Sequence, residues 1–174
     1  MPTFVALLRA VNVGGTGKLP MTELKNMCEA AGFTSVRTYI ASGNVVFDSR
    51  LSETKVKAAL EAALLQYAGK PVKVMVRSGA ELAQVLAANP FAHEAPNRTV
   101  AIFLDGAPPA DTLQTLSGKK DEEIALGTRE IYVHYGEGMG QSKLNIRAAA
   151  EGTARNINTI AKLAEMASAP KPKS

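Results

Sequence analysis

The order of the apolar segments in the first half of the chain constrains its fold more than any other feature of the sequence. A β-branched apolar run over residues 3–13 predicts a buried strand, and the apolar residues of 20–31 recur at helical spacing before Gly32. The stretches VRTYI and NVVFD read as two strands joined by a glycine-containing turn. A long helix over 52–68 and the strand KPVKVMVR complete the series. The order β-α-β-β-α-β predicts a ferredoxin-like half.

The second half follows a similar order without repeating the sequence. A helix over 78–88 and the loop NPFAHEAPN lead to TVAIFLD, an apolar strand expected to be buried on both faces. A short helix over 110–116, the hairpin EEIALGTREIYVHY, and helices from about residue 142 and over 155–167 follow. We therefore predict an α+β fold of two ferredoxin-like βαββαβ-type halves packed together, the second lacking a regular final strand. The alternative is one continuous mixed sheet.

No linker rich in serine or proline separates the halves, which we place at residues 1–78 and 79–167 and expect to pack as one compact unit. Residues 168–174, which include the stretch APKPKS, are predicted to be a disordered tail. Lys171 and Lys173 lie in this tail, and removing their two charges from the net charge of +4 leaves +2. So mild a charge argues against broad, non-specific binding to a polyanion, although a local basic patch stays open.

Composition also limits the cellular setting. No stretch approaches the roughly 20 apolar residues of a membrane span, and the start MPTFVALLRAVN has no basic leader, so we expect a cytoplasmic protein. The one cysteine, Cys28, excludes an internal disulfide, and its place on the apolar stripe of a helix indicates an inert core thiol. His93 and His134 are far apart, and no cluster of histidine, cysteine and aspartate has metal-ligand spacing, so no metal site is predicted.

The stretch LLRAVNVGGTGKLP carries three glycines and a lysine, and it invites comparison with nucleotide-binding loops. A Walker loop aligned on its GK pair would need glycine at Asn12 and serine or threonine at Leu19. A dinucleotide fingerprint would need a third glycine at Pro20, which has no N–H to offer a phosphate. Both motifs fail, which excludes P-loop NTPases and Rossmann oxidoreductases. We interpret the stretch as a wide turn before a proline-started helix.

Five motifs run through the chain in one order: LLRAVNVGGTGKLPM, GFTSVRTYIASGNVVF, ANPF, GMGQSKL and TARNINTIAKL. Together they resemble the bacterial family called domain of unknown function 1697, from about Phe4 to Leu163. The chain departs from the family pattern at Ile157, where an aromatic residue is usual, and at Gly136, where proline is frequent. The resemblance implies a cytoplasmic α+β fold and no particular reaction.

The C-terminal motifs suggest a site for an anion. The loop GEGMGQSKL ends at Ser142, a good helix N-cap, and glycine-rich loops that enter helices can offer N–H groups to an anion. The last predicted helix has polar side chains on one face, namely Arg155, Thr159 and Lys162. In the alternative interpretation, Thr153 caps this helix and the charged face is only solvated.

We therefore predict that residues distant in the sequence converge on one pocket for a small anionic ligand, phosphorylated or nucleotide-like. The candidate residues are Arg9, Asn12, Lys18, Ser42, Asn44, Ser142, Lys143, Arg155, Asn156, Thr159 and Lys162. Ser42 and Asn44 have a second interpretation, in which they shape the turn between two strands. Arg9 is either an anion contact or a structural ion-pair partner. The sequence specifies no reaction and no cofactor.

Two other functions stay open. A ferredoxin-like sheet is covered by helices on one face, and the other face would carry a basic set consisting of Arg9, Arg37, Tyr39, Lys73 and Arg77. An exposed face of this kind would bind nucleic acid, but RNA-recognition sheets place aromatic residues on their central strands, where this chain supplies only Phe47. The second alternative is a non-catalytic, homodimeric scaffold with a large apolar interface.

Overall fold

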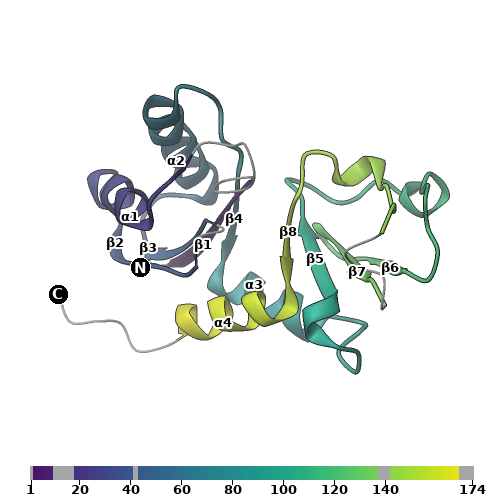
Figure 1. Cartoon of the computed structure of the whole chain (residues 1–174). Helices are drawn as coiled ribbons and strands as arrows, with labels where there is room; N and C mark the ends of the chain where they lie inside the picture. Colours follow the sequence, from purple (N-terminus) through teal and green to yellow (C-terminus); the bar gives the residue numbers. More distant parts are fainter. Residues whose placement is uncertain (1, 10–17, 41–42, 137–141, 169–174) are drawn as a thin grey trace. The chain divides into compact units, whose positions relative to one another are not determined.

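The computed structural model describes residues 2–9, 18–40, 43–136 and 142–168 (Figure 1). The chain divides into two compact units, unit 1 with Met1–Ala83 and Lys162–Ser174, and unit 2 with Gln84–Ala161. Both boundaries fall inside helices, in α3 (Gly79–Ala87) and α4 (Ile157–Ser168), rather than at residue 78. Among the described residues, no helix combines the length and the apolar character that a membrane crossing requires. The predicted tail begins at Ser168 inside α4, and residues 169–174 lie outside the described ranges.

Unit 1 contains one antiparallel sheet with the strand order β2-β3-β1-β4. Its strands are β1 (Thr3–Leu8), β2 (Thr34–Thr38), β3 (Asn44–Asp48) and β4 (Val74–Ser78). Strand β1 lies between β3 and β4, so each helical connection passes over one strand, as in a ferredoxin-like half. The predicted series β-α-β-β-α-β is confirmed. Of the predicted strand over 3–13, Arg9 already lies outside β1, and residues 10–13 are not described.

Two helices, α1 (Met21–Ala30) and α2 (Glu53–Ala68), lie on the same side of this sheet (Figure 1). They pack on alternate strand residues in a core that includes Phe4, Ala6, Leu8, Leu24, Cys28, Phe47, Val56, Leu60 and Leu64. Ser52 caps α2 as predicted, because its hydroxyl oxygen accepts the N–H of Lys55 at 3.3 Å. The apolar side chains that recur at helical spacing in α1 and α2 pack on the sheet and hold both helices there.

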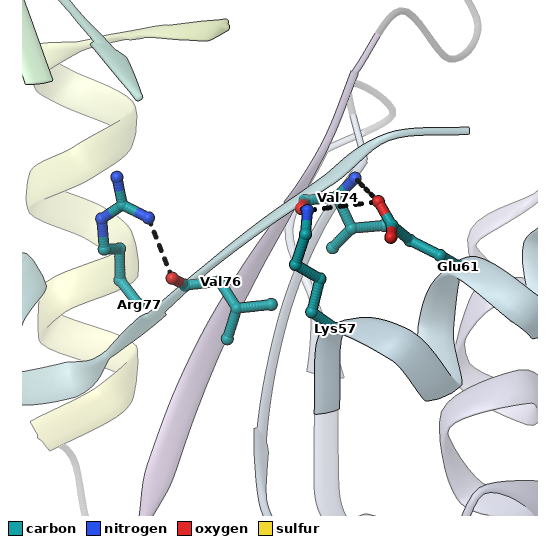
Figure 2. A network of polar contacts seen from close by, with 5 residues as sticks. All are labelled: Lys57, Glu61, Val74, Val76 and Arg77. Carbon is teal, nitrogen blue, oxygen red and sulfur yellow. Dashed lines mark hydrogen bonds and ion pairs between the residues drawn. The ribbon is translucent and has the colours of Figure 1, made fainter. Parts of the chain in front are cut away.

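The edge strand β4 is closed by side chains of α2 (Figure 2). The carboxylate of Glu61 accepts the N–H of Val74 at 3.1 Å, and the ammonium group of Lys57 donates to the Val74 carbonyl oxygen. Lys57 and Glu61 also form an ion pair one helical turn apart, with Nζ and Oε2 separated by 3.2 Å. Edge strands offer unpaired backbone groups to other chains, so this pair protects the start of β4 against such pairing.

Unit 2 contains a second antiparallel sheet with the strand order β6-β7-β5-β8. Its strands are β5 (Thr99–Phe103), β6 (Glu123–Leu126), β7 (Glu130–His134) and β8 (Thr153–Asn156). This order is the same as in unit 1 when the strands are counted from β5. One face of the sheet packs on a core formed by Val100, Ile102, Leu104, Ile131, Val133 and Ile146.

Two predictions for the second half are wrong. A final strand is present, because Thr153–Asn156 pairs with β5, and α4 begins at Ile157 rather than at residue 155. The segments that were expected to be helical, over 110–116 and from about residue 142, contain, in the residues that the structure describes, the 3₁₀ turns η2 (Thr112–Gln114) and η4 (Arg147–Ala149) and no α-helix. Unit 2 therefore keeps the ferredoxin-like sheet, and the described parts of its two crossover connections contain no α-helix.

The fourth strands of the two sheets end in the same local structure. Arg77 is the cross-strand partner of the third residue of β1, and Arg155 is the partner of the third residue of β5. Each arginine Nη1 donates to the carbonyl oxygen of the residue before it, at 3.0 Å for Arg77 and 2.9 Å for Arg155. Ser78 and Asn156 then cap the following helices α3 and α4. This correspondence agrees with an approximate structural duplication.

Candidate functional site

The predicted ligand residues of unit 1 that the structure describes are either exposed or part of a turn. Arg9 and Lys18 are exposed, and the Arg9 N–H donates to the Lys73 carbonyl oxygen at 2.9 Å, which extends the pairing of β1 with β4. Asn44 is fully buried, and its amide nitrogen donates to the Tyr39 carbonyl oxygen at 2.9 Å. The side chain of Asn44 thus shapes the β2–β3 turn. Asn12 and Ser42 lie outside the described residues.

The predicted cationic face of the last helix is wrong, because Arg155 lies on β8. Its guanidinium group is buried and donates to the Thr153 hydroxyl at 3.1 Å, and burial lowers the pKa of Arg155 to about 10. The cap of α4 is Asn156 rather than Thr153, since Oδ1 of Asn156 accepts the N–H of Thr159 at 2.8 Å. Lys162 lies 3.7 Å from a carboxylate oxygen of Glu165. These residues build β8 and α4.

No single unit holds the whole predicted set. Unit 1 contains Arg9, Lys18, Asn44 and Lys162, and unit 2 contains Ser142, Lys143, Arg155, Asn156 and Thr159. Of these residues, Ser142 and Lys143 lie in the connection between β7 and β8, outside the helices and strands of the described chain.

The Ser142–Lys143 segment lies beside the loop of residues 117–122. Ser117 and Asn145 form an isolated antiparallel bridge with N···O distances of 3.1 and 2.8 Å. Next to the bridge, Gly118 has φ +73° and packs against the Lys143 carbonyl, whose oxygen would be 1.9 Å from a Cβ at this position. Only glycine fits there. The bridge and this contact bring Lys119 and Lys120 next to Lys143 although they are distant in the sequence.

Glu122 joins the two segments through its carboxylate. Oε2 accepts the hydroxyl hydrogen of Ser142 at 2.6 Å, and Oε1 accepts the N–H of Lys120 at 2.6 Å. These bonds, that of Ser142 first, lower the pKa of Glu122, so the group is ionised at neutral pH. The Ser142 oxygen also accepts the Leu144 N–H at 3.2 Å, which makes Ser142 a turn residue rather than the predicted helix cap.

We call Lys119, Lys120 and Lys143 the lysine cluster. All three residues are exposed, and they come from two neighbouring segments. Both oxygens of the neighbouring Glu122 carboxylate accept hydrogen bonds, its charge also acts on Lys119, and the carboxylate of Asp121 lies against Gly136. The cluster can therefore offer ammonium groups to an anion. Lys119 and Lys120 were not predicted, because a helix from residue 142 would leave no place for the Ser117–Asn145 bridge that brings the two segments together.

The predicted basic sheet face is only partly exposed. The strand register places Arg37, Val46, Val5 and Arg77 in one row across the sheet, so the predicted set shares a face. However, Val5, Val46 and Arg77 in this row are at most 1 % exposed. Arg37 donates to the carbonyl oxygens of Ser35 at 2.9 Å and Met166 at 2.8 Å. Nucleic-acid binding by this face would require an exposed Arg77, but Arg77 is buried.

In the part of the chain that the structure describes, no three histidine, cysteine, aspartate or glutamate side chains form a group that could hold a metal ion. Cys28 is buried in the core of unit 1. Burial raises the pKa of its thiol to about 12, which agrees with the prediction of an inert core thiol.

A family model described as "Protein of unknown function (DUF1697)" matches residues 1–132, while the motifs GMGQSKL and TARNINTIAKL lie beyond this range. No curated protein matches the chain. Among solved structures, the conserved bacterial protein SP0830 from Streptococcus pneumoniae is similar over 95 % of this chain and 98 % of its own, with 23 % sequence identity and a TM-score of 0.78. This similarity confirms the mixed fold of two ferredoxin-like halves.

Proposed function

We propose that this chain, which belongs to the DUF1697 family of proteins of unknown function, binds a small anionic ligand at the lysine cluster of unit 2. The observation that supports the proposal is the Glu122 carboxylate, which holds the Lys119–Lys120 loop and the Ser142–Lys143 segment together. The ligand class is a phosphorylated or nucleotide-like small molecule.

Electrostatics favours an anion at this place. Lysine ammonium groups from two adjoining backbone segments can contact one phosphate together, and each such contact is favourable. Lysine is a common phosphate ligand because its ammonium group is a compact charge with three donors. The cluster also lies on irregular connections supported by a sheet, which is where binding residues are frequent.

Several contacts between the two segments hold the backbone on either side of the lysine cluster. The Ser117–Asn145 bridge, the Gly118–Lys143 contact and the two bonds of Glu122 define the backbone that carries the lysines. A backbone that is already ordered before binding lowers the entropic cost of binding a ligand.

Thermal unfolding of the full chain tests the proposal, with pyrophosphate, sugar phosphates and nucleoside mono- and triphosphates as probes. A ligand that binds only the folded chain stabilises it by RT ln(1 + [L]/Kd), so the melting temperature rises with ligand concentration; sodium sulfate at equal ionic strength serves as the reference for general anion effects. We expect Lys143→Gln and Lys120→Gln each to weaken binding about tenfold, equivalent to roughly 1.4 kcal/mol.

Lys25→Gln is the matched control, because Lys25 is an exposed lysine on α1 in unit 1. Equal weakening by Lys25→Gln and Lys143→Gln would show that the chain attracts anions only through its net charge. If no probe exceeds the sulfate reference, the proposal is wrong. Binding of single-stranded RNA by the cluster, with no small phosphate bound, would assign it to nucleic acid instead.

A further inference from the structure

The edge strand β6 has backbone groups that nothing else in the described chain engages. In the sheet of unit 2, β6 pairs with β7 alone, and the bonds of an antiparallel pair involve every second residue. The Gly127 N–H donates to the Glu130 carbonyl oxygen at 2.7 Å, so Ala125, two residues earlier, also bonds to β7. Its neighbours Ile124 and Leu126 therefore direct their N–H and C=O groups away from β7. Among the described residues, no hydrogen bond engages these outward groups.

The other three edges of the two sheets are closed or interrupted. On β4, side chains of α2 bind the outward N–H and C=O groups of Val74 (Figure 2). On β8, Arg155 donates to the Ala154 carbonyl oxygen at 2.9 Å. On β2, the pairing with β3 shifts register between Thr34 and Arg37. Bulges and covering groups of this kind prevent edge strands from pairing with other chains, and the described residues of β6 have neither.

The same edge leaves an apolar side chain uncovered. Ile124 packs against the core of unit 2, and Leu126, two residues later, lies on the same face of the sheet. Leu126 is 36 % exposed, so the core face of the sheet ends in an apolar residue at this edge. A further strand beside β6 would cover this residue.

A second copy of β6 fits this edge in an antiparallel register, with Ala125 opposite Ala125 of the other copy. Each Ile124 then lies opposite a Leu126, and the two residues exchange both of their N–H···O bonds. The outward groups of both strands are all used in this way. The same register places the exposed Leu126 beside an Ile124 side chain, and apolar cross-strand pairs stabilise sheets.

The charges at the ends of β6 also favour an antiparallel second copy. Asp121 and Glu123 are exposed at its start, and Arg129 follows its end. An antiparallel pair places the start of one strand beside the end of the other, so the carboxylates of one copy lie near the guanidinium group of the other. A parallel pair would instead place carboxylates beside carboxylates. The lysines before Asp121 lie on the loop beside the Ser142–Lys143 segment rather than on the strand.

We propose that β6 is a docking edge for a second copy of this chain, which adds its own β6 and joins the two unit 2 sheets into one continuous sheet. The strand is four residues long, so the dimer is weak and reversible, with a dissociation constant on the order of 100 µM. This interface is a backbone edge, in contrast to the large apolar interface expected of a homodimeric scaffold. It does not depend on anion binding at the lysine cluster.

Cysteine cross-linking of the full chain tests the register. In the proposed pair, Ala125 faces its own copy in a position where the Cα atoms are about 4.5 Å apart, which suits a disulfide. We therefore expect Ala125→Cys to form a disulfide dimer under mild oxidation, while Cys28 stays buried. Glu123→Cys is the matched control, because the two Cα atoms at this position are about 13 Å apart. Equal yields from the two variants would overturn the register, and an Ala125→Cys protein that stays monomeric would overturn the docking edge.

Sedimentation velocity from about 10 µM to about 1 mM measures the dimer of the unmodified chain. We expect Leu126→Lys to raise the dissociation constant at least about tenfold, because a lysine on an edge strand opposes pairing. Leu113→Lys is the control, since Leu113 is an exposed leucine of η2 in the same unit, and it should change the constant less than about twofold.

A wild type that stays monomeric over this range would overturn the proposal, and so would a dimer that Leu126→Lys leaves intact. A monomeric chain that binds an extended peptide of another protein at β6 would assign the edge to that partner and overturn the second copy.

Discussion

Gly118 packs against the backbone carbonyl of Lys143 so closely that no side chain fits between them. The contact involves two backbones, so neither partner can move aside as a flexible side chain would. Together with the Ser117–Asn145 bridge, it determines how the two lysine-bearing segments of unit 2 meet.

The first prediction is that Gly118→Ala destabilises unit 2 and weakens anion binding together. Alanine would need a left-handed backbone, with φ at +73°, and its Cβ would clash with the Lys143 oxygen. We expect a loss of about 2 kcal/mol or more in the free energy of unfolding, measured in urea. Gly106→Ala is the control, because a Cβ there meets nothing within 4 Å. A Gly118→Ala protein as stable as Gly106→Ala would contradict the close contact.

The second prediction concerns acid. The pKa of Glu122 is lowered in the folded protein, so its stabilising effect is present above the ordinary pKa of glutamate and is lost as pH falls through the folded value. Urea midpoints at pH 6.0 and pH 3.5 should therefore fall more in the wild type than in Glu122→Gln. Ser142→Ala removes the largest cause of the shift and should give an intermediate loss. A wild type with the same acid sensitivity as Glu122→Gln would be inconsistent with the hydrogen bonds of this carboxylate.

The first half of the fold could be predicted because its helices and strands follow sequence patterns that lie within each element and extend over many residues. Helix α2 has a serine cap and repeated apolar spacing over four turns, and β1 alternates its residues between the two faces of the sheet. In contrast, β8 is only four residues long, and its sequence TARN runs directly into the helical pattern of α4. Pairing with β5 determines its strand structure, and no local pattern reports that pairing.

The candidate site shows the same limit. Ser142 and Lys143 were predicted from a glycine-rich loop, but the contacts that place Lys119 and Lys120 beside them join residues that are distant in the sequence. Arg155 was assigned to a helix face because its spacing to Thr159 fits one, whereas the helix begins two residues later. Spacing along the sequence thus identified polar residues and did not identify their neighbours.

The third prediction concerns alkali. Burial raises the pKa of the Cys28 thiol from 9.0 to about 12, so the contribution of this group to stability is intact below pH 9 and is lost as pH rises toward 12. Between pH 8 and pH 10, we expect the free energy of unfolding to fall by about 1 kcal/mol more in the wild type than in Cys28→Ala. Urea unfolding at the two pH values measures this difference. Parallel losses in both proteins would mean that the thiol ionises as easily in the fold as in the unfolded chain.

The fourth prediction tests where α4 begins. Oδ1 of Asn156 accepts the Thr159 N–H at 2.8 Å, so Asn156→Ala should lower the free energy of unfolding by about 1 kcal/mol. Asn156→Ser keeps a capping oxygen and should retain most of the stability. Thr153→Val leaves this cap in place and removes a bond to Arg155 instead, so the two variants should differ in the hydrogen exchange of the first turn of α4. Faster exchange of that turn in Thr153→Val and not in Asn156→Ala would show that the helix begins at residue 155, as predicted from the sequence.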